Sequence, residues 1–229
     1  MFDRWKAKPR DSGGLRTAGE AAARPKPEHP AEEQIYTRPS NGLQQFFSAV
    51  SDFQGFPILD LAGASQANVS AITGLGFSLY SDNVIRSLEN AFGSGAECLE
   101  NQSDPVKVQQ FIDSTLDFEP SHFGGALLWD TLQFLSPPLL QDTVDQLHEI
   151  LMPGGYMLAF FHANERAESV PVYSYRIAAD TKSIVLATRG ERRAATYVNN
   201  RAIEKLFQKF SSVKFFLTRD HLREVIVRR

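Results

Sequence analysis

Hydrophobic residues in the middle of the chain alternate between helical spacing and short continuous runs. Leu43, Phe46 and Val50 fall on one helical face, whereas residues 56–61 form a compact apolar run that is typical of a buried strand. The same distinction predicts strands at residues 56–61, 77–82, 126–129 and 156–162. It predicts helices at residues 41–50, 65–74, 84–92, 104–116 and 137–151. Such an alternation implies an α/β sheet of parallel strands joined by right-handed crossovers.

The pattern is least regular between residues 94 and 119. A doubly wound sheet calls for a third strand here, and the sequence offers no obvious one. Asp104-Pro105 instead favours a helix start, with Phe111 and Leu116 on the apolar face that follows. The third strand is therefore expected to be short or missing.

The C-terminal third has a strand-rich pattern. Residues 172–177 and 183–188 are two apolar runs joined around Asp180, as in a β-hairpin. After a further amphipathic helix, residues 213–217 and 222–227 form two runs separated by a tight turn. We expect these last two strands to end the parallel sheet in an antiparallel pair.

The first 38 residues differ in composition from the rest of the chain. They combine prolines and charged residues with few large apolar side chains, so they cannot bury enough surface to offset the entropy of ordering. We predict a disordered tail over residues 1–38 and one domain over residues 39–229. Residues 172–188 are interpreted as a hairpin inserted in that domain.

Charge is unevenly distributed, although the formal net charge is only −3. Residues 41–175 contain 3 Lys and Arg against 16 Asp and Glu, a balance of −13. Residues 176–229 contain 13 against 5, a balance of +8. The acidic stretch argues against nucleic acid wrapped around the whole domain. The basic part either attracts an anionic partner or pairs with acidic residues inside the fold.

Composition also narrows the class of protein. Cys98 is the single cysteine, which excludes an intrachain disulfide and a cysteine-based metal cluster. The five histidines are scattered, so we predict no metal site. No apolar run approaches the roughly 20 residues of a membrane span, and the N-terminus lacks the apolar stretch of a signal peptide. We therefore expect a cytoplasmic protein without a membrane segment, whose oligomeric state the sequence does not specify.

Three features at predicted strand ends suggest a nucleotide site. Asp60 ends a strand and is followed by a turn of small residues at 61–65, which lets the backbone approach a ligand. Asp82 follows 22 positions later, at the end of the next strand, where an acid can accept hydrogen bonds from ribose hydroxyls. The third feature is a glycine-containing turn from helix to strand at residues 152–155. It is preceded along the chain by Asp130, which lies at another strand end.

Together these features resemble the class I S-adenosylmethionine-dependent methyltransferases. Residues 58–61 look like the strand that leads into the family's glycine-rich motif, and Asp82 is similar to the acid that holds the cofactor ribose. Residues 151–156 look like the turn before the family's fifth strand. The resemblance covers roughly residues 45–229. It implies a three-layer Rossmann-like α/β fold, with a mostly parallel sheet and an antiparallel C-terminal strand.

The turn after Asp60 departs from the family's pattern. The family has glycines where this chain has Ala62, Ala64 and Gln66, and only Gly63 is kept, one step out of phase. Alanine disfavours a positive φ and costs about 1 kcal/mol where one is needed. This departure bears more on activity than on the fold.

The resemblance implies S-adenosylmethionine as the cofactor. Asp82 would bind its ribose, Asn83 would flank the adenine, and Asp130 would pair with the α-ammonium group. The residues implied to bind the cofactor are Asp60, Leu61, Ala62, Gly63, Ala64, Asn68, Asp82, Asn83, Trp129 and Asp130. Each also has a structural explanation, because strand-end acids cap helices, Asp-Asn pairs suit turns, and tryptophans pack in cores.

Other polar residues are weaker candidates. His162 ends the predicted fifth strand, on the same sheet edge as the other candidates. It is either a general base or a histidine whose hydrogen bonds are met within the protein. Asp113 or Asp117 would meet the adenine amino group. Three tyrosines either line a substrate lid or simply pack: Tyr173, Tyr175 and Tyr197.

The leading hypothesis is methyl transfer from S-adenosylmethionine to a small-molecule or protein acceptor that the sequence does not identify. The alternative is a methyltransferase-like domain that has lost catalysis and serves as a binding or assembly module. A nicotinamide-dependent Rossmann protein would need a G-x-G-x-x-G turn, which is absent after Asp60.

Overall fold

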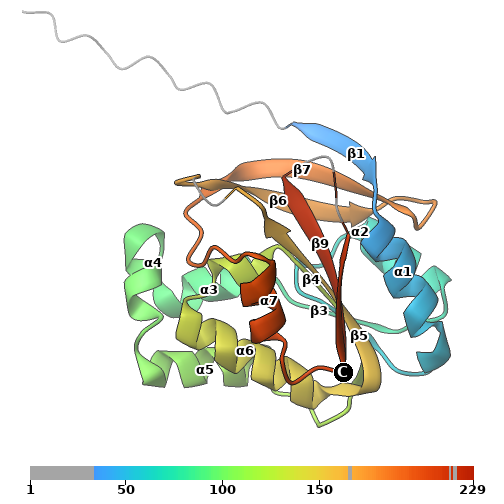
Figure 1. The fold of residues 1–229 in the computed structure, drawn as a ribbon, viewed down its shortest axis with the longest axis horizontal. Coiled ribbons are helices and arrows are strands. Elements are labelled where there is room, and N and C mark those ends of the chain that lie inside the picture. Colours follow the sequence, from blue (N-terminus) through green and yellow to red (C-terminus); the bar gives the residue numbers. More distant parts are fainter. Residues whose placement is uncertain (1–33, 165–166, 217, 219–220) are drawn as a thin grey trace, which may run out of the picture. The chain divides into compact units, whose positions relative to one another are not determined.

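A mixed six-stranded sheet forms the centre of the protein. The computed structural model describes residues 34–164, 167–216, 218 and 221–229. The strand order is β3-β2-β4-β5-β9-β8, with the first four strands parallel and the last two antiparallel to their neighbours (Figure 1). The strands are β2 (Ile58–Asp60), β3 (Leu79–Ser81), β4 (Phe123–Trp129), β5 (Leu151–His162), β8 (Ser212–Phe216) and β9 (Leu222–Arg228). The predicted α/β fold with an antiparallel C-terminal end is confirmed.

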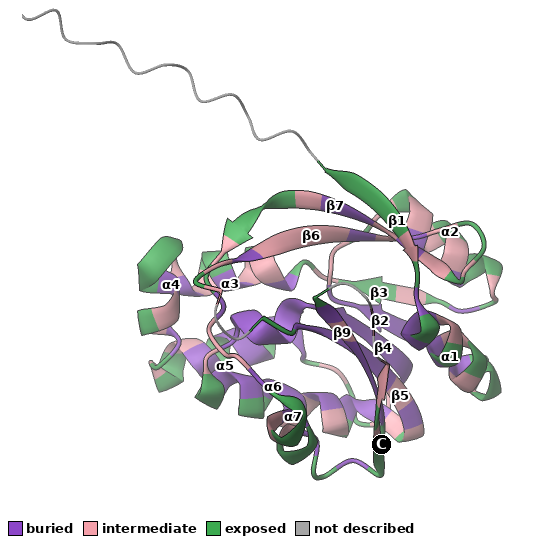
Figure 2. Ribbon diagram, turned by 45° about the horizontal axis from the view of Figure 1, so that its top comes forward, coloured by how far each residue is buried: buried purple, intermediate pink, exposed green. Residues whose placement is uncertain are grey.

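Helices cover both faces of this sheet. The helices are α1 (Asn41–Val50), α2 (Gln66–Gly74), α3 (Val84–Phe92), α4 (Gly95–Asn101), α5 (Pro105–Thr115), α6 (Pro137–Ile150) and α7 (Asn200–Leu206). The alternation along β4 divides the core: Ala126 and Leu128 pack with residues of α3, α5 and α6, whereas Leu127 and Trp129 pack with residues of α1 and α2. Figure 2 shows the buried central strands between these layers. The fold therefore has the predicted three layers.

The third strand that a doubly wound sheet would place after α3 is missing. Between Ser81 and Phe123, all of them described residues, the chain forms three helices and no strand. The helix at Asp104-Pro105 begins as predicted, because the Asp104 side chain accepts hydrogen bonds from Val106 N and Lys107 N. The short α4 was not predicted.

A second, three-stranded antiparallel sheet has the order β1-β7-β6. Its strands are β1 (Ile35–Pro39), β6 (Val170–Ile177) and β7 (Ser183–Arg192). The predicted hairpin is confirmed, and the Asp180 carboxylate closes its turn by accepting from Lys182 N and Ser183 N. Residues 35–38 were placed in the tail by composition, yet they form β1 because β7 supplies backbone partners. Residues 1–33 of the predicted tail lie outside the described residues.

The glycine-containing stretch at residues 152–155 is an irregularity inside β5 rather than a turn before it. The pairing of β5 with β4 advances from Leu151 to Tyr156 while β4 advances only from Phe123 to Gly125. Gly154 accommodates this bulge with φ +81°. The prediction of a helix-to-strand turn here was therefore wrong, because β5 begins at Leu151 rather than at Tyr156.

A buried carboxylate ties the second sheet and α1 to the first sheet. Glu224 on β9 is fully buried and accepts from Arg38 Nη1 and Gly42 N, both at 2.6 Å. A Cβ at Gly42 would lie 2.7 Å from this carboxylate, so only glycine fits there. Sequence analysis did not single out Glu224.

Part of the basic C-terminal third pairs with the acidic segment, as one of the two interpretations expected. Arg192 lies 3.2 Å from Glu89, and Lys209 lies 2.9 Å from Asp145. None of the helices in the described part of the chain combines the length and the apolar character that a membrane span requires.

Candidate functional site

The turn after β2 lies beside the end of β3 at the carboxyl edge of the parallel strands, where open α/β sheets bind ligands. Ala62 forms an isolated bridge with Asn83. Gly63 has φ +92°, and a Cβ there would lie 3.2 Å from the Asn83 side chain. Neither Ala62 nor Ala64 has a positive φ. The one glycine therefore stands where the turn needs it, and the alanines add no backbone strain.

Asp60 is completely buried behind this turn. Its Oδ1 accepts from Trp129 Nε1 at 2.7 Å and from Ala62 N at 3.1 Å, and its Oδ2 accepts from Asn68 Nδ2 at 2.9 Å. Burial raises the pKa of the Asp60 carboxyl, and these hydrogen bonds oppose the rise. Protein donors thus occupy the carboxylate, which positions the turn rather than facing a ligand.

Asn68 connects the same turn to the hairpin. Besides bonding Asp60, its Nδ2 donates to Tyr175 O at 3.2 Å, and its Oδ1 accepts from Ile177 N at 2.8 Å. The Asn68 side chain is fully buried, so it acts like a backbone partner for β6. Ser65 caps α2 by accepting from Asn68 N at 3.1 Å.

The end of β3 presents Asp82, whose side chain is half-buried. Its Oδ1 accepts from Asn83 N at 2.7 Å, and its Oδ2 accepts from Ser87 Oγ at 3.1 Å. Asn83 caps α3 by accepting from Arg86 N. These bonds hold the carboxylate at the sheet edge and leave it further lone pairs for a ligand.

Trp129 ends β4 in a strained conformation. Its φ is +51°, which for a bulky residue costs on the order of 1–3 kcal/mol. The indole ring stacks on the Tyr175 ring of β6, with centroids 4.8 Å apart and planes 16° apart. Both side chains are buried, so the strand end is covered by the hairpin.

A buried polar cluster is formed by Asp130, which follows Trp129, and His162, which ends β5. Not all of its polar atoms have hydrogen-bond partners. Asp130 Oδ2 lies 3.6 Å from His162 Nε2. Among the described residues these two atoms and the Tyr175 hydroxyl lack a hydrogen-bond partner of normal geometry. Burial raises the pKa of Asp130, which His162 opposes, and burial together with Asp130 raises the pKa of Tyr175 well above its usual value. Such a concentration of unsatisfied buried groups is typical of a functional site.

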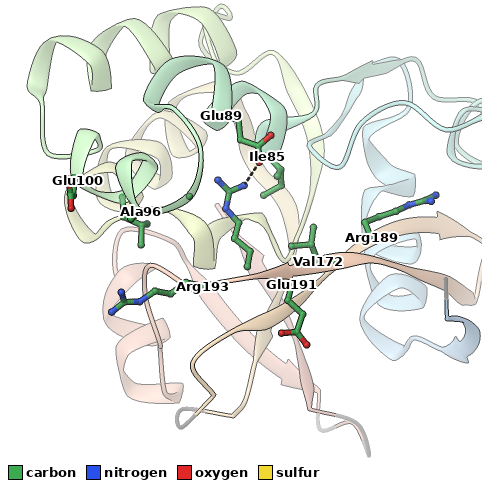
Figure 3. A pocket seen from close by; sticks show the side chains of 12 residues that line it. Ile85, Glu89, Ala96, Glu100, Val172, Arg189, Glu191 and Arg193 are labelled. Carbon is green, nitrogen blue, oxygen red and sulfur yellow. Dashed lines mark hydrogen bonds and ion pairs between the residues drawn. The ribbon is translucent and has the colours of Figure 1, made fainter. Parts of the chain in front are cut away.

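Cavities adjoin the turn and run under the hairpin. One of about 540 Å³ reaches Asp130, and one of about 460 Å³ reaches Asp82. They share five lining residues: Ala62, Asn83, Arg86, Ser174 and Arg189. A third cavity, of about 620 Å³, continues between α3, α4 and β7 (Figure 3). In Figure 3 the Glu89 carboxylate is joined by a dashed line to an arginine side chain of β7, which is the Arg192 ion pair across this cavity.

Six of the ten implied cofactor residues line the first two cavities: Ala62, Gly63, Ala64, Asp82, Asn83 and Asp130. The other four line neither and lie behind the cavity walls: Asp60, Leu61, Asn68 and Trp129. Asp113 and Asp117 are exposed at the C-terminal end of α5 and line none of the described cavities, since the strand that would have placed them at the site is missing.

The hairpin contributes residues that sequence analysis weighed lightly or missed. Tyr173 stacks on the His162 ring and lines the cavity at Asp130. Tyr197 lines none of the described cavities near Asp82 and Asp130, and its hydroxyl donates to Ala167 O. Arg86 and Ser174 line both cavities, and no sequence pattern marked them because their placement depends on how the hairpin packs.

Strand order and direction decide the fold. The order and directions of the strands are those that the class I methyltransferase-like fold implied by the sequence requires. The chain lacks the third strand, and it carries the second sheet in addition. No protein-family model matches the chain, and no curated protein sequence matches it.

Solved structures with this fold resemble the chain at low sequence identity. A S-adenosylmethionine-dependent methyltransferase from Archaeoglobus fulgidus has a TM-score of 0.45 and 9% identity, over 82% of this chain and 92% of that one. The 1,6-didemethyltoxoflavin-N1-methyltransferase of Burkholderia thailandensis, solved with bound 1,6-didemethyltoxoflavin and S-adenosylhomocysteine, has a TM-score of 0.43 and 10% identity. The match covers 82% of this chain and 78% of that one. An S-adenosylmethionine-dependent methyltransferase from Methanosarcina mazei has a TM-score of 0.40 and 14% identity, over 77% of this chain and 93% of that one.

Proposed function

We propose that this chain binds S-adenosylmethionine in the cleft between the turn after β2 and the hairpin, and transfers its methyl group to an acceptor. One observation carries the proposal: six residues chosen from the sequence as cofactor ligands line two adjoining cavities at the carboxyl edge of the parallel strands. These residues follow three different strands, and the two cavities that they line supply the space that a cofactor needs.

The residues present fit the cofactor. The cavities, of about 540 and 460 Å³, are in the size range of small-molecule sites, which is about 300–1,000 Å³. The Asp82 carboxylate offers acceptors for two ribose hydroxyls, and the Asp130 carboxylate offers an acceptor for an ammonium group. Gly63 lets the backbone turn closely beside them.

The protein's own contribution is to bind, orient and remove a proton. When bound, S-adenosylmethionine supplies an electrophilic methyl group. Asp130 Oδ2 lies 3.6 Å from Nε2 of His162, and the His162 ring stacks on Tyr173. His162 lines a separate cavity of about 280 Å³, which shares Tyr173 with the cavity at Asp130. An acceptor that extends into it can give up its hydroxyl or amine proton to the imidazole. The hairpin covers the strand ends and excludes water from this cluster.

Isothermal titration with S-adenosylhomocysteine tests the site. We expect the wild-type protein to bind it, and Asp82→Asn to bind it about tenfold or more weakly, because hydrogen bonds to a charged group contribute about 1.5–3 kcal/mol. Asp142→Asn is the matched control, since Asp142 is exposed on α6 and lines none of the described cavities. It should bind as the wild type does.

Absence of heat at hundreds of micromolar S-adenosylhomocysteine, with the protein folded, would exclude the proposed cofactor. Equal affinities of Asp82→Asn and Asp142→Asn would exclude the proposed ribose contact while leaving the cofactor in place. Methyl transfer itself is tested by incubating the protein with labelled S-adenosylmethionine and candidate acceptors.

A second candidate is a methyltransferase-like module without catalysis. The packing of Tyr175 against Trp129 favours it, because the hairpin covers part of the strand edge. The bonds of Asn68 to β6 fix the hairpin in that place. Binding of S-adenosylhomocysteine would count against this candidate, and its absence would support it.

A further inference from the structure

Basic residues from opposite walls line the cavity beside Asp82. Arg86 comes from α3, whereas Arg176 and Arg189 come from the hairpin strands β6 and β7. Asp82 is the one acidic residue among those lining this cavity. Its carboxylate already accepts from Asn83 N and Ser87 Oγ. The cavity walls therefore carry an excess of positive charge.

The neighbouring cavities are balanced. In the cavity at Asp130, Arg86 and Arg189 stand against Glu89 and Asp130. In the cavity between α4 and β7, three arginines stand against three glutamates. Excess positive charge in the cleft is thus confined to the end beside Asp82. This is notable because Arg86 is one of just three basic residues among residues 41–175, a segment with a balance of −13.

Two of these arginines also have no internal partner. In the described part of the chain, the guanidinium groups of Arg86 and Arg176 make neither an ion pair nor a hydrogen bond. By contrast, Arg38 pairs with Glu224, and Arg192 pairs with Glu89. Like charges that converge on one concave surface without a counterion repel each other, and a bound anion would relieve that repulsion.

We propose that Arg86 and Arg176 form an oxyanion subsite that binds a carboxylate or phosphate group of a ligand held in the cleft. The inference rests on the proposed function in part, because the oxyanion is either the carboxylate of the cofactor or an acidic group of the methyl acceptor. Guanidinium groups suit either source, since their paired N–H donors match the oxygens of both groups. Serine hydroxyls of Ser65 and Ser174 line the same cavity and add neutral donors.

The test compares three probes on Arg86→Gln, Arg176→Gln and the control Arg201→Gln, which alters an exposed arginine of α7 that lines none of the described cavities. The probes are inorganic pyrophosphate, S-adenosylhomocysteine and 5′-methylthioadenosine, which lacks the amino-acid part of the cofactor. Affinities are measured by isothermal titration. Thermal unfolding with and without pyrophosphate gives a second readout.

If the subsite holds the cofactor carboxylate, Arg86→Gln and Arg176→Gln bind S-adenosylhomocysteine about tenfold more weakly and 5′-methylthioadenosine unchanged. If it holds an acidic group of the acceptor, both variants keep S-adenosylhomocysteine affinity and lose pyrophosphate binding and its stabilisation. Either result supports the subsite, and without a probe both variants should unfold at or above the wild-type temperature.

The inference is overturned if both variants bind every probe as the control does, or if pyrophosphate fails to bind the wild type while S-adenosylhomocysteine affinity is unaffected in the variants. Failure of the proposed function looks different. In that case the wild type binds neither S-adenosylhomocysteine nor 5′-methylthioadenosine. The oxyanion subsite is then supported if pyrophosphate binding is lost in Arg86→Gln and Arg176→Gln, and overturned if it is not.

Discussion

Two buried polar clusters lie side by side at the same sheet edge and differ in how their hydrogen bonds are met. In the first, which we call the closed cluster, Asp60 and Asn68 bond to each other, to Trp129 and to the backbone of β6. In the second, the open cluster, Asp130, His162 and Tyr175 interact with one another but have polar atoms without a hydrogen bond of normal geometry among the described residues.

The difference separates scaffold from site. A buried polar group costs about 1–3 kcal/mol when it lacks a partner, so the open cluster is a stability cost that the closed cluster avoids. Evolution tolerates such a cost chiefly where a ligand or reaction uses the free groups. The closed cluster holds the turn and hairpin in place, whereas Asp130, Tyr175 and His162 of the open cluster each line one of three cavities around the hairpin.

Asn68→Ala should have the largest effect on the free energy of unfolding. It removes three hydrogen bonds and leaves Ile177 N and one oxygen of the buried Asp60 without a partner. We expect a loss of about 3 kcal/mol, measured by urea denaturation. The control is Asn90→Ala on the exposed face of α3, which should change stability by no more than about 0.5 kcal/mol. A loss below about 1 kcal/mol for Asn68→Ala would show that the cluster is not closed.

Local parts of this arrangement could be predicted from the sequence. The helix from Val84 to Phe92, the capping roles of Ser65 and Asp104, and the hairpin closed by Asp180 depend on neighbouring residues. Their patterns therefore contain the necessary information. The cavity-lining residues Asp82 and Asp130 were found because each ends a strand at the carboxyl edge.

The long-range parts could not be predicted. Asn68 and Ile177 are 109 residues apart, and Gly42 and Glu224 are 182 apart. Nothing near these residues indicates that they meet. β1 was missed for the same reason, because its partner β7 lies far along the chain and most of its own residues are exposed. The sequence thus indicated where a site should lie, but not how the hairpin closes it.

The next largest effect concerns the dependence of stability on pH. Burial raises the pKa of the Asp130 carboxyl above its usual 3.8, although His162 opposes the rise. Between the unfolded and the folded pKa the folded protein binds more protons than the unfolded chain. Stability therefore falls as the pH rises through this window, and the loss is complete above the raised pKa. Asp130→Asn should lose less stability than the wild type does as the pH rises above the usual carboxyl value of 3.8.

Asp60→Asn is the matching substitution in the closed cluster. It also removes a carboxyl whose pKa burial raises, but it turns an amide NH2 group toward the donors that surround Asp60. It should therefore destabilise the protein at every pH, by about 2 kcal/mol or more. Urea denaturation of both variants across the pH range provides the comparison. If Asp130→Asn keeps the wild-type slope, Asp130 does not titrate differently on folding.

Tyr175→Phe should have the smallest effect on the free energy of unfolding. It tests most directly whether the two clusters differ in their hydrogen bonds. The hydroxyl has no hydrogen-bond partner of normal geometry among the described residues, and the ring stacks on Trp129 in either case. Removing a buried polar atom without a partner leaves nothing unsatisfied, so stability should stay within about 0.5 kcal/mol of the wild type or rise slightly. A loss above about 1.5 kcal/mol would mean that the hydroxyl is bonded in the folded protein. The two clusters would then not differ in how their hydrogen bonds are met, and the open cluster would no longer support a functional site at this sheet edge.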